Sequence, residues 1–404
     1  MDSYDVIVVG GGPAGGECAR ELSKKGHSVL MVEQSKSFKD NNFSSAGMTL
    51  DPLDKFNIPE TTVGSYWKNM VIQCSKKGYK WKGDKAKGVV LDFGRLRQFL
   101  ADDCITNNGG VLMGHKYFKK EVEKDCVVAF FKNLETLETV KIKAKLLVDA
   151  TGPLRKVIYD DKNEIPEFEV ASGIEYLIEV EQNIYNKCKE SLIFFLGDKW
   201  APSGYSWIFP MENNILKVGS GKLHEQNVNM KNQASTKEMI LKIIDDYLEA
   251  DTYKVIDIHG GTLKYSQGLK DVFYQNKVVA IGDAVSTVNP LGGEGIQYAM
   301  ENGALAAKYI SQYLTSGKEN FKKYRSKWRR KYFFKWYLCE ASTRRMYNKY
   351  DDEKIEKRVQ YYHQNANIDG LINVLFNFNF NKIIYRLISS IFYKYLFEIF
   401  KKEK

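Results

Sequence analysis

The beginning of the chain, residues 4–16, reads YDVIVVGGGPAGG and decides the fold. Residues 6–9 form a continuous apolar run, which is typical of a parallel strand that is covered on both faces. The glycine-rich turn leads into a segment, 17–25, that we expect to be helical. In such a unit the glycines allow a tight turn and a close approach to a pyrophosphate, and the helix N-terminus binds the phosphates. The turn residues that we expect at the phosphates are Gly10, Gly12, Pro13, Ala14 and Gly15.

A second strand, residues 29–32, follows the helix and ends at Glu33. An acidic residue at this distance from the glycines is placed to accept hydrogen bonds from ribose hydroxyls. The alternative, a glycine-rich surface turn, does not explain why strand, turn, helix, strand and acid occur in this order. The sequence therefore predicts a Rossmann-like dinucleotide-binding unit.

Motifs far downstream indicate which dinucleotide binds. An apolar strand at 278–284 runs into Gly282 and Asp283, and a proline-glycine loop, 289–295, precedes a further helix. Another strand that ends in a turn is expected at 146–152, near the same cofactor. A domain that binds only NAD has no use for such distant elements, whereas FAD is long enough to reach a returning strand. We therefore predict FAD as the cofactor.

These three motifs resemble those of the FAD oxidoreductases with a single fingerprint, a family that includes aromatic hydroxylases and geranylgeranyl reductases. The resemblance implies that Asp283, beside Gly282, holds the ribitol of FAD. It also implies that the loop at 289–295 lies beside the flavin, where backbone N–H groups and a helix N-terminus stabilise negative charge. The loop residues expected at the flavin are Pro290, Gly292, Gly293 and Gly295.

An arginine on a helix expected at 91–107 is a further candidate for binding the cofactor. In the family that the chain resembles, an arginine on this helix reaches the FAD pyrophosphate, and here Arg95 and Arg97 lie near the helix start. A guanidinium group suits charge-assisted contacts with phosphate. We expect Arg95 to make this contact, and solvent exposure of either arginine is the alternative.

The segment 204–210, GYSWIFP, resembles the GYxWxFP motif of geranylgeranyl reductases, which saturate isoprenoid chains. Because side chains alternate along a strand, Tyr205, Trp207 and Phe209 share one face. Three large aromatic side chains over the flavin would form an apolar slot for a long polyprenyl chain. We therefore expect all three to bind substrate, with Tyr205 and Trp207 at the catalytic centre. The alternative is that they belong to the core of the sheet.

The chain departs from these reductases at one informative place. They commonly carry a cysteine-glycine pair shortly after the second strand, whereas this chain has Ser44 and Ser45 there and no cysteine between Cys18 and Cys74. A mechanism that needs a thiol at this place is therefore not expected. The serines are expected either to hydrogen-bond the flavin or the substrate, or to cap a loop.

The predicted fold class is α/β (α+β), with a Rossmann-like FAD-binding domain interleaved with an antiparallel-sheet substrate domain. The FAD-binding domain is expected at 1–164 and 262–315, and the substrate domain at 165–261, where the pattern becomes alternating and aromatic. A basic, aromatic helical region is expected at 316–404.

Composition agrees with a globular protein, since 44% of the residues are hydrophobic and 27% are charged. The six cysteines are scattered without metal-site spacing, which indicates reduced thiols in a reducing compartment, the cytoplasm or a plastid stroma. The fingerprint begins almost at Met1, so neither a signal peptide nor secretion is expected. The five histidines are isolated and suggest neither a triad nor a metal site.

Positive charge is concentrated in residues 321–350, which contain eleven Lys/Arg and one acidic residue. This excess is enough to account for the net charge of +10. Aromatic residues are interleaved with these charges, and a second, strongly apolar segment at 383–400 is interrupted by single charges. Both segments are typical of helices that lie at a membrane surface. The alternative is a helical hairpin that packs on the FAD-binding domain. No nucleic-acid partner is expected, because no nucleic-acid fold accompanies the basic segment.

The predicted function is reduction of double bonds in a geranylgeranyl-type polyprenyl lipid by hydride transfer from reduced FAD. The proton for the other alkene carbon would come from water or a nearby hydroxyl, with Tyr205 as the candidate. The electron donor, NADPH or a reduced ferredoxin, is left open because no second fingerprint is present. Alternatives are a monooxygenase resembling the aromatic hydroxylases, a carotenoid cyclase-like flavoprotein without net redox change, and a non-catalytic flavin-binding membrane scaffold.

Overall fold

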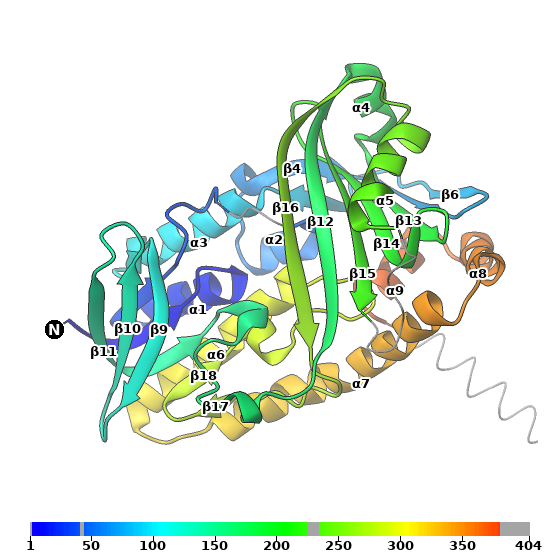
Figure 1. Ribbon diagram of the computed structural model, residues 1–404. Coiled ribbons are helices and arrows are strands. Elements are labelled where there is room, and N and C mark those ends of the chain that lie inside the picture. Colours follow the sequence, from blue (N-terminus) through cyan, green and yellow to red (C-terminus); the bar gives the residue numbers. More distant parts are fainter. Residues whose placement is uncertain (1, 41–43, 225–233, 380–404) are drawn as a thin grey trace, which may run out of the picture.

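The computed structural model describes residues 2–40, 44–224 and 234–379 of the chain. Two large sheets stand next to each other, and helix α7 (Phe321–Asn348) runs past both of them (Figure 1). The eight-stranded sheet is called here the Rossmann sheet, and the seven-stranded sheet the covering sheet. This arrangement confirms the predicted α/β class.

The Rossmann sheet is built around β1 (Ser3–Val9), which pairs in parallel with β2 (Val29–Val32) and β11 (Thr139–Asp149). Strand β18 (Val278–Ala280) pairs in parallel with β11. Val9 lies opposite both Val32 and Asp149, and Asp149 lies opposite Ala280. The four strands therefore end at one edge, where the turns that follow them meet. The sheet is completed by β8 (Gly110–Leu112), β9 (His115–Val122), β10 (Val127–Asn133) and β17 (Tyr274–Gln275).

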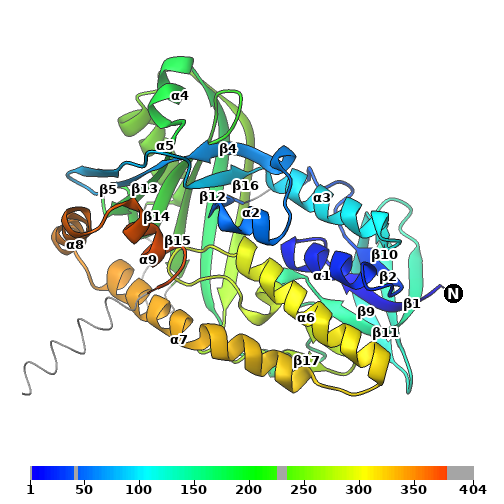
Figure 2. The ribbon, with the colours of Figure 1, turned by 180° about the vertical axis from the view of Figure 1, so that it is seen from behind.

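Helix α1 (Pro13–Ser23) packs against both α3 (Phe93–Thr106) and α6 (Ile296–Ser316) beside this sheet (Figure 2). The approach of α6 is close, because a Cβ atom on Gly303 would lie 2.4 Å from the carbonyl oxygen of Ala14. A Cβ atom on Gly15 would lie 2.0 Å from the carbonyl oxygen of Gly10. The absence of a side chain at both positions therefore sets the distance between the helices and the glycine-rich turn.

The covering sheet has the strand order β16-β12-β15-β14-β13-β5-β6. All neighbours are antiparallel except β5 and β13, which pair in parallel. Its strands are β5 (Asn69–Gln73), β6 (Gly78–Trp81), β12 (Glu169–Val180), β13 (Ser191–Gly197), β14 (Ala201–Pro210), β15 (Ile215–His224) and β16 (Tyr253–Tyr265).

The boundaries expected for the substrate domain, 165–261, are too narrow for this sheet. Strands β5 and β6 come from the segment that was assigned to the FAD-binding domain, and β16 extends to Tyr265. The physical reason is the parallel pairing of β5 with β13, a contact between distant segments that local sequence patterns do not reveal.

Smaller elements complete the fold. A three-stranded sheet is formed by β3 (Gly47–Thr49), β4 (Val63–Trp67) and β7 (Gly88–Leu91). The short helices are α2 (Asp51–Lys55), α4 (Gln182–Cys188) and α5 (Thr236–Ile243), the last continued by a π-helical turn at Ile244–Leu248. Single 3₁₀ turns lie at Glu60–Thr62, Gly152–Leu154, Lys162–Glu164 and Gly282–Val285.

The C-terminal helices α7, α8 (Asp352–Asn365) and α9 (Ile368–Leu375) pack on both sheets. Tyr324, Trp328 and Trp336 of α7 are buried in the core of the Rossmann sheet, so the packed-hairpin alternative describes this face of the helix. The opposite face of α7 leaves Phe334 and Tyr337 56% and 58% exposed. None of the helices described here is long and apolar enough to cross a bilayer. The segment 383–400 lies outside the described residues.

Replacing Gly303 by valine should destabilise the protein, because the new side chain would overlap the backbone of Ala14. Overpacking of this kind lowers the free energy of unfolding by about 1–3 kcal/mol. The matched control is Ala304→Val, since Ala304 is the next residue of α6 and is only partly buried. Urea denaturation of both variants checks the expectation, and equal losses would show that helix propensity, not the close approach, is responsible.

Candidate functional site

The glycine-rich turn at the end of β1 is held in place by Glu33. One carboxyl oxygen of Glu33 accepts a hydrogen bond from the Gly11 N–H at 2.8 Å, and the other accepts one from the Ser35 N–H at 2.9 Å. A Cβ atom on Gly12 would have no neighbour within 4 Å, so the backbone there faces open space. The turn is thus preorganised with an open backbone, as a pyrophosphate site requires. Contact of Glu33 with a ribose stays a prediction.

Arg97, not Arg95, lies at the glycine-rich turn. The Arg97 Nε donates to the carbonyl oxygen of Gly11 at 3.2 Å, and its guanidinium lies 3.8 Å from the Glu33 carboxylate. Arg95 is half exposed and forms an ion pair with Glu212 at 2.5 Å. Side chains two positions apart on a helix point in directions that differ by about 200°. Only one of the two arginines can therefore face the turn. The structure places Arg97 rather than Arg95 at the turn, and contact of an arginine with FAD stays a prediction.

The packing around Arg97 explains how a cation is held there. Its guanidinium carbon lies 4.9 Å from the ring centre of Phe38 and 5.5 Å from that of Phe93. Burial lowers the pKa of Arg97, and the nearby Glu33 carboxylate opposes this shift, so the side chain is a buried cation. Such a preorganised guanidinium suits a phosphate.

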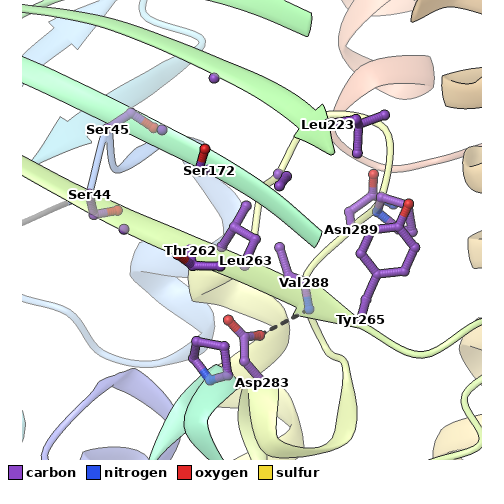
Figure 3. A pocket seen from close by; sticks show the side chains of 18 of the residues that line it. Ser44, Ser45, Ser172, Leu223, Thr262, Leu263, Tyr265, Asp283, Val288 and Asn289 are labelled. Carbon is purple, nitrogen blue, oxygen red and sulfur yellow. Dashed lines mark hydrogen bonds between the residues drawn. The ribbon is translucent and has the colours of Figure 1, made fainter. Parts of the chain in front are cut away.

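Asp283 follows β18 at the same edge of the sheet. Its Oδ1 accepts hydrogen bonds from the Thr287 hydroxyl at 2.9 Å and the Val288 N–H at 3.0 Å, the second of which is drawn in Figure 3. Its Oδ2 takes part in neither bond. Burial raises the pKa of this carboxyl, so an additional hydrogen-bond donor at Oδ2 would stabilise its charged form. Hydroxyl groups of a ribitol would supply such donors.

A cavity of about 280 Å³, here called the cofactor cleft, extends from the edge of the Rossmann sheet to the covering sheet. Figure 3 shows that its walls come from the connection after β2, from β12 and β16, and from the segment after β18. Labelled examples are Ser44, Ser45, Ser172, Thr262, Asp283 and Asn289. The expected residues Pro13, Tyr205, Trp207, Pro290, Gly293 and Gly295 also line it.

One wall of the cofactor cleft is a row of four paired residues of the covering sheet, three of which are glycines. Tyr205 on β14 lies opposite Gly221 on β15. Gly221 in turn lies opposite Gly173 on β12, and Gly173 lies opposite Gly261 on β16. Residues directly opposite one another share a face of the sheet. The covering sheet therefore presents one aromatic ring and three bare backbone positions to the cleft, which leaves room for a flat ligand.

The proline-glycine loop before α6 separates the cleft from a second, larger cavity. The Asn289 side-chain oxygen accepts hydrogen bonds from the Leu291 and Gly292 N–H groups, at 2.8 and 3.3 Å. The Gly292 carbonyl oxygen in turn accepts a hydrogen bond from the Tyr205 hydroxyl at 2.6 Å. Gly293 has φ +65°, in the left-handed region that favours glycine. The loop is thus fixed from both sides.

The second cavity, here called the apolar chamber, has a volume of about 660 Å³. It is enclosed by the covering sheet, the proline-glycine loop and helices α7, α8 and α9. Tyr205 and Gly293 line both the chamber and the cofactor cleft, so the two cavities adjoin at this point. Its largely apolar lining includes Ile72, Phe194, Leu196, Phe209, Leu371, Val374, Leu375 and Phe376.

The three aromatic residues of GYSWIFP share one face but lie in different surroundings. Tyr205 stands where the two cavities adjoin, Trp207 lines the cofactor cleft, and Phe209 lines the chamber. Trp207 and Phe209 are also buried in a core cluster, so the core alternative holds in part. Their contact with a substrate stays a prediction.

Two buried charged residues of the covering sheet were missed by the sequence analysis. Lys217 on β15 donates to the carbonyl oxygens of Ser44, Leu91 and Ser45, at 2.8, 3.3 and 3.4 Å. Burial lowers the pKa of Lys217, and the neighbouring Glu175 opposes this shift. The lysine therefore ties the serine segment to the covering sheet. The only signal in the sequence was a lysine within the apolar first half of the strand, residues 215–218.

Glu175 on β12 orients Trp207. Its Oε2 accepts a hydrogen bond from the Trp207 indole N–H at 2.8 Å, whereas its Oε1 has no hydrogen-bond partner among the described residues. Burial raises the pKa of Glu175 although Lys217 lies nearby. A Cβ atom on Gly219 would lie 2.2 Å from the Trp207 ring, so the indole lies directly over this glycine. Trp207 is thus locked beside the cleft.

Glu294, in the proline-glycine loop, is a third buried ionisable group. Neither of its carboxyl oxygens has a hydrogen-bond partner in the described part of the chain. Burial raises the pKa of the Glu294 carboxyl to about 8, and the neighbouring Gln297 side chain opposes this shift. The carboxyl is therefore mostly protonated, and uncharged, at neutral pH.

Comparison with known proteins gives the family. The family model for lycopene cyclase proteins matches residues 5–361, and the chain therefore belongs to this family. The chain is 28% identical to a digeranylgeranylglycerophospholipid reductase of Haloferax volcanii, over 79% of this chain and 78% of that one. A reductase of the same name from Methanocaldococcus jannaschii is 24% identical over 88% and 89% of the two chains.

Solved structures share the fold. A geranylgeranyl bacteriochlorophyll reductase-like protein of Thermoplasma acidophilum has a TM-score of 0.81 at 21% identity and covers 96% of this chain and 99% of its own. The p-nitrophenol 4-monooxygenase of Pseudomonas putida has a TM-score of 0.70 at 14% identity, over 93% and 97%. Together with the relatives, these matches confirm the resemblance to FAD oxidoreductases of the geranylgeranyl reductase type.

Replacing Arg97 by glutamine should weaken FAD binding, because a buried cation would be lost from the glycine-rich turn. We expect the dissociation constant of FAD to rise about tenfold, as for loss of one charge-assisted contact. Arg95→Gln is the matched control, since Arg95 pairs with Glu212 instead, and should change it by less than about twofold. Flavin fluorescence titration of the apoproteins checks this, and a larger effect of Arg95→Gln would restore the original assignment.

Proposed function

We propose that this FAD-dependent oxidoreductase reduces carbon–carbon double bonds in a polyprenyl chain of the geranylgeranyl type. One observation carries the proposal: the large apolar chamber adjoins the cofactor cleft at Tyr205 and Gly293. A long hydrocarbon chain could lie in the chamber while one of its double bonds reaches the cleft. The similarity to digeranylgeranylglycerophospholipid reductases supports this substrate class.

The residues of the cleft, together with the glycine-rich turn that reaches it at Pro13, fit FAD. The open backbone at Gly12 and the buried cation of Arg97 suit the pyrophosphate, and Asp283 has a carboxyl oxygen left for a ribitol hydroxyl. The bare strip at Gly173 and Gly221 leaves space for a flat ring. When bound and reduced, FAD supplies a hydride to one carbon of an alkene.

The protein's own part is to hold the alkene, to exclude water and to supply a proton. Apolar side chains of the chamber bind the chain through burial of hydrocarbon surface. The Tyr205 hydroxyl is protonated at neutral pH, as an ordinary tyrosine is, and burial raises its pKa further. In this structure it donates that proton to the Gly292 carbonyl oxygen, so transfer to an alkene carbon requires this hydrogen bond to break and water to reprotonate the phenolate. We assign Tyr205 as the proton donor to the second alkene carbon, with Trp207 fixing the chain beside it. NADPH and reduced ferredoxin remain the two proposed electron donors.

A second candidate is a carotenoid cyclase-like reaction without net redox change. The match of residues 5–361 to the lycopene cyclase family favours it. The same chamber would hold a polyprenyl chain, so product mass distinguishes the two: reduction adds two hydrogens per alkene, and cyclisation adds none. The likeness to the p-nitrophenol monooxygenase extends to the fold alone.

An anaerobic experiment tests the proposal. The FAD-loaded protein is photoreduced, a geranylgeranyl lipid is added, and flavin reoxidation is followed together with product mass. We expect reoxidation with a gain of two hydrogens for each double bond reduced. Reoxidation only after air is admitted would contradict the proposal for that lipid, and a product of unchanged mass would favour cyclisation.

Val374→Trp should impair this reaction, because it places a large ring inside the chamber. We expect the KM for a geranylgeranyl lipid to rise by about tenfold or more, since pockets discriminate strongly by volume. Asn373→Trp is the matched control, because Asn373 is the neighbouring residue of α9 and is exposed. Equal kinetics of the two variants would mean that the chain does not occupy the chamber.

We further propose that the outer face of α7 contacts a membrane surface. Phe334 and Tyr337 are exposed on a helix rich in Lys and Arg, and Tyr337 also lines the chamber. An aromatic, basic helix face is attracted to anionic bilayers. A lipid could then enter the chamber directly from the bilayer.

Phe334→Ser should reduce binding to phosphatidylglycerol vesicles in a sedimentation assay, by about threefold to tenfold for loss of one inserted ring. Phe118→Ser is the control, because Phe118 is exposed to a similar degree, 53% against 56%, but lies on β9. Binding that is absent in the wild type, or lost equally in both variants, would refute contact through α7.

A further inference from the structure

The apolar chamber has an uneven distribution of charge. Three ionisable side chains that could carry charge near neutral pH line it: Glu294, Arg345 and Arg358. The Glu294 carboxyl is buried and mostly protonated at neutral pH. Arg345 and Arg358 are exposed, so they mark the side on which the chamber meets solvent. The interior is therefore uncharged, and the mouth carries two positive charges.

The two arginines differ from the other basic residues around them. Arg344, next to Arg345, pairs with Glu169 and Glu340, and on α8 Lys357 pairs with Glu353. By contrast, no ion pair or side-chain hydrogen bond of Arg345 or Arg358 is found within residues 2–40, 44–224 and 234–379. The Arg358 guanidinium carbon instead lies 4.7 Å from the ring centre of Tyr350, which also lines the chamber.

Two guanidinium groups from different helices at the mouth of one cavity are a suitable site for a phosphate. Guanidinium binds phosphate through paired, charge-assisted hydrogen bonds, and two such groups can share one phosphate. Tyr350 also lines this cavity and carries a hydroxyl group that could donate to a phosphate oxygen, whereas the Ser342 hydroxyl donates to the Leu338 carbonyl oxygen at 2.8 Å. The dipole of α7 also stabilises a positive charge in its last turn, which would explain Arg345 without a ligand. It does not explain Arg358, which lies within α8.

We propose that Arg345 and Arg358 bind the phosphate of an amphiphilic substrate whose polyprenyl chain lies in the apolar chamber. This rests on the proposed function and adds to it the part of the substrate that does not react. The phosphate anchors one end of the molecule at the mouth, so the length of chain between phosphate and cleft selects which double bond reaches Tyr205. The phosphate belongs either to a glycerophospholipid headgroup or to a simple prenyl phosphate.

Binding to the FAD-loaded protein tests this without turnover. Isothermal titration below the micelle concentration compares geranylgeraniol, geranylgeranyl phosphate and a digeranylgeranyl glycerophosphate. We expect the phosphate-bearing ligands to bind the wild type about tenfold more tightly than the alcohol. The double variant R345Q/R358Q should lose this preference while its affinity for geranylgeraniol changes by less than about twofold. Arg330→Gln, a lost cation on α7 away from the chamber lining, should keep the preference.

Either phosphate source supports the site, and the ligand that shows the larger preference identifies the source. Equal affinities for alcohol and phosphate in the wild type, or a preference that survives in R345Q/R358Q, would overturn it. The outcome is independent of the reaction: a phosphate preference without anaerobic alkene reduction would remove the proposed function and leave the site. Alkene reduction without a phosphate preference would leave the proposed function and remove the phosphate site.

Discussion

The register of four parallel strands is the constraint on which the rest of the structure depends. Because β2, β1, β11 and β18 end at one edge, the glycine-rich turn, Glu33, the turn after Asp149 and Asp283 are brought together from distant parts of the chain. Asp149 shows how firmly this edge is built, since its carboxylate accepts hydrogen bonds from the N–H groups of Thr151, Val157 and Ile158. A shift of one strand by one residue would separate these groups and reverse the faces of its side chains.

Helix α7 connects the Rossmann sheet to the proline-glycine loop and to the apolar chamber. Its Trp336 donates to the Ser286 carbonyl oxygen at 3.3 Å, and its Thr343 donates to the Pro290 carbonyl oxygen at 2.9 Å. Ser286 lies in the segment that joins Asp283 to the proline-glycine loop, and Pro290 lies in the loop itself. The same helix then lines the apolar chamber with its last turns. The basic, aromatic segment thus fixes the loop between the two cavities, whatever its outer face contacts.

The parts predictable from the sequence are those encoded by local patterns. The turn at residues 10–15, the strand before Gly282 and the shared face of GYSWIFP each depend on neighbouring residues, and the structure has the expected elements there. Which of Arg95 and Arg97 faces the glycine-rich turn could not be predicted, because it depends on the rotation of α3 about its axis, which tertiary packing sets. The pairing of β5 with β13 and the chamber between β14 and α7–α9 could not be predicted, because both arise from contacts between distant segments.

The two cavities differ in a way that suits two different ligands. In the cofactor cleft, three successive strands of the covering sheet present Gly221, Gly173 and Gly261, so a planar group can lie against bare backbone. Farther along β14 and β15, Phe209 lies opposite Lys217. The ammonium group of Lys217 donates hydrogen bonds to carbonyl oxygens of the serine segment. Lys217 and the other residues of β15 do not line the chamber, whose wall on the covering sheet is formed by apolar and aromatic residues of β5, β13 and β14. Burying that charge is costly unless its hydrogen bonds are complete, and three carbonyl acceptors use all three of its protons. A neutral side chain would have avoided this cost, which indicates that the position of the serine segment beside the cleft depends on the lysine.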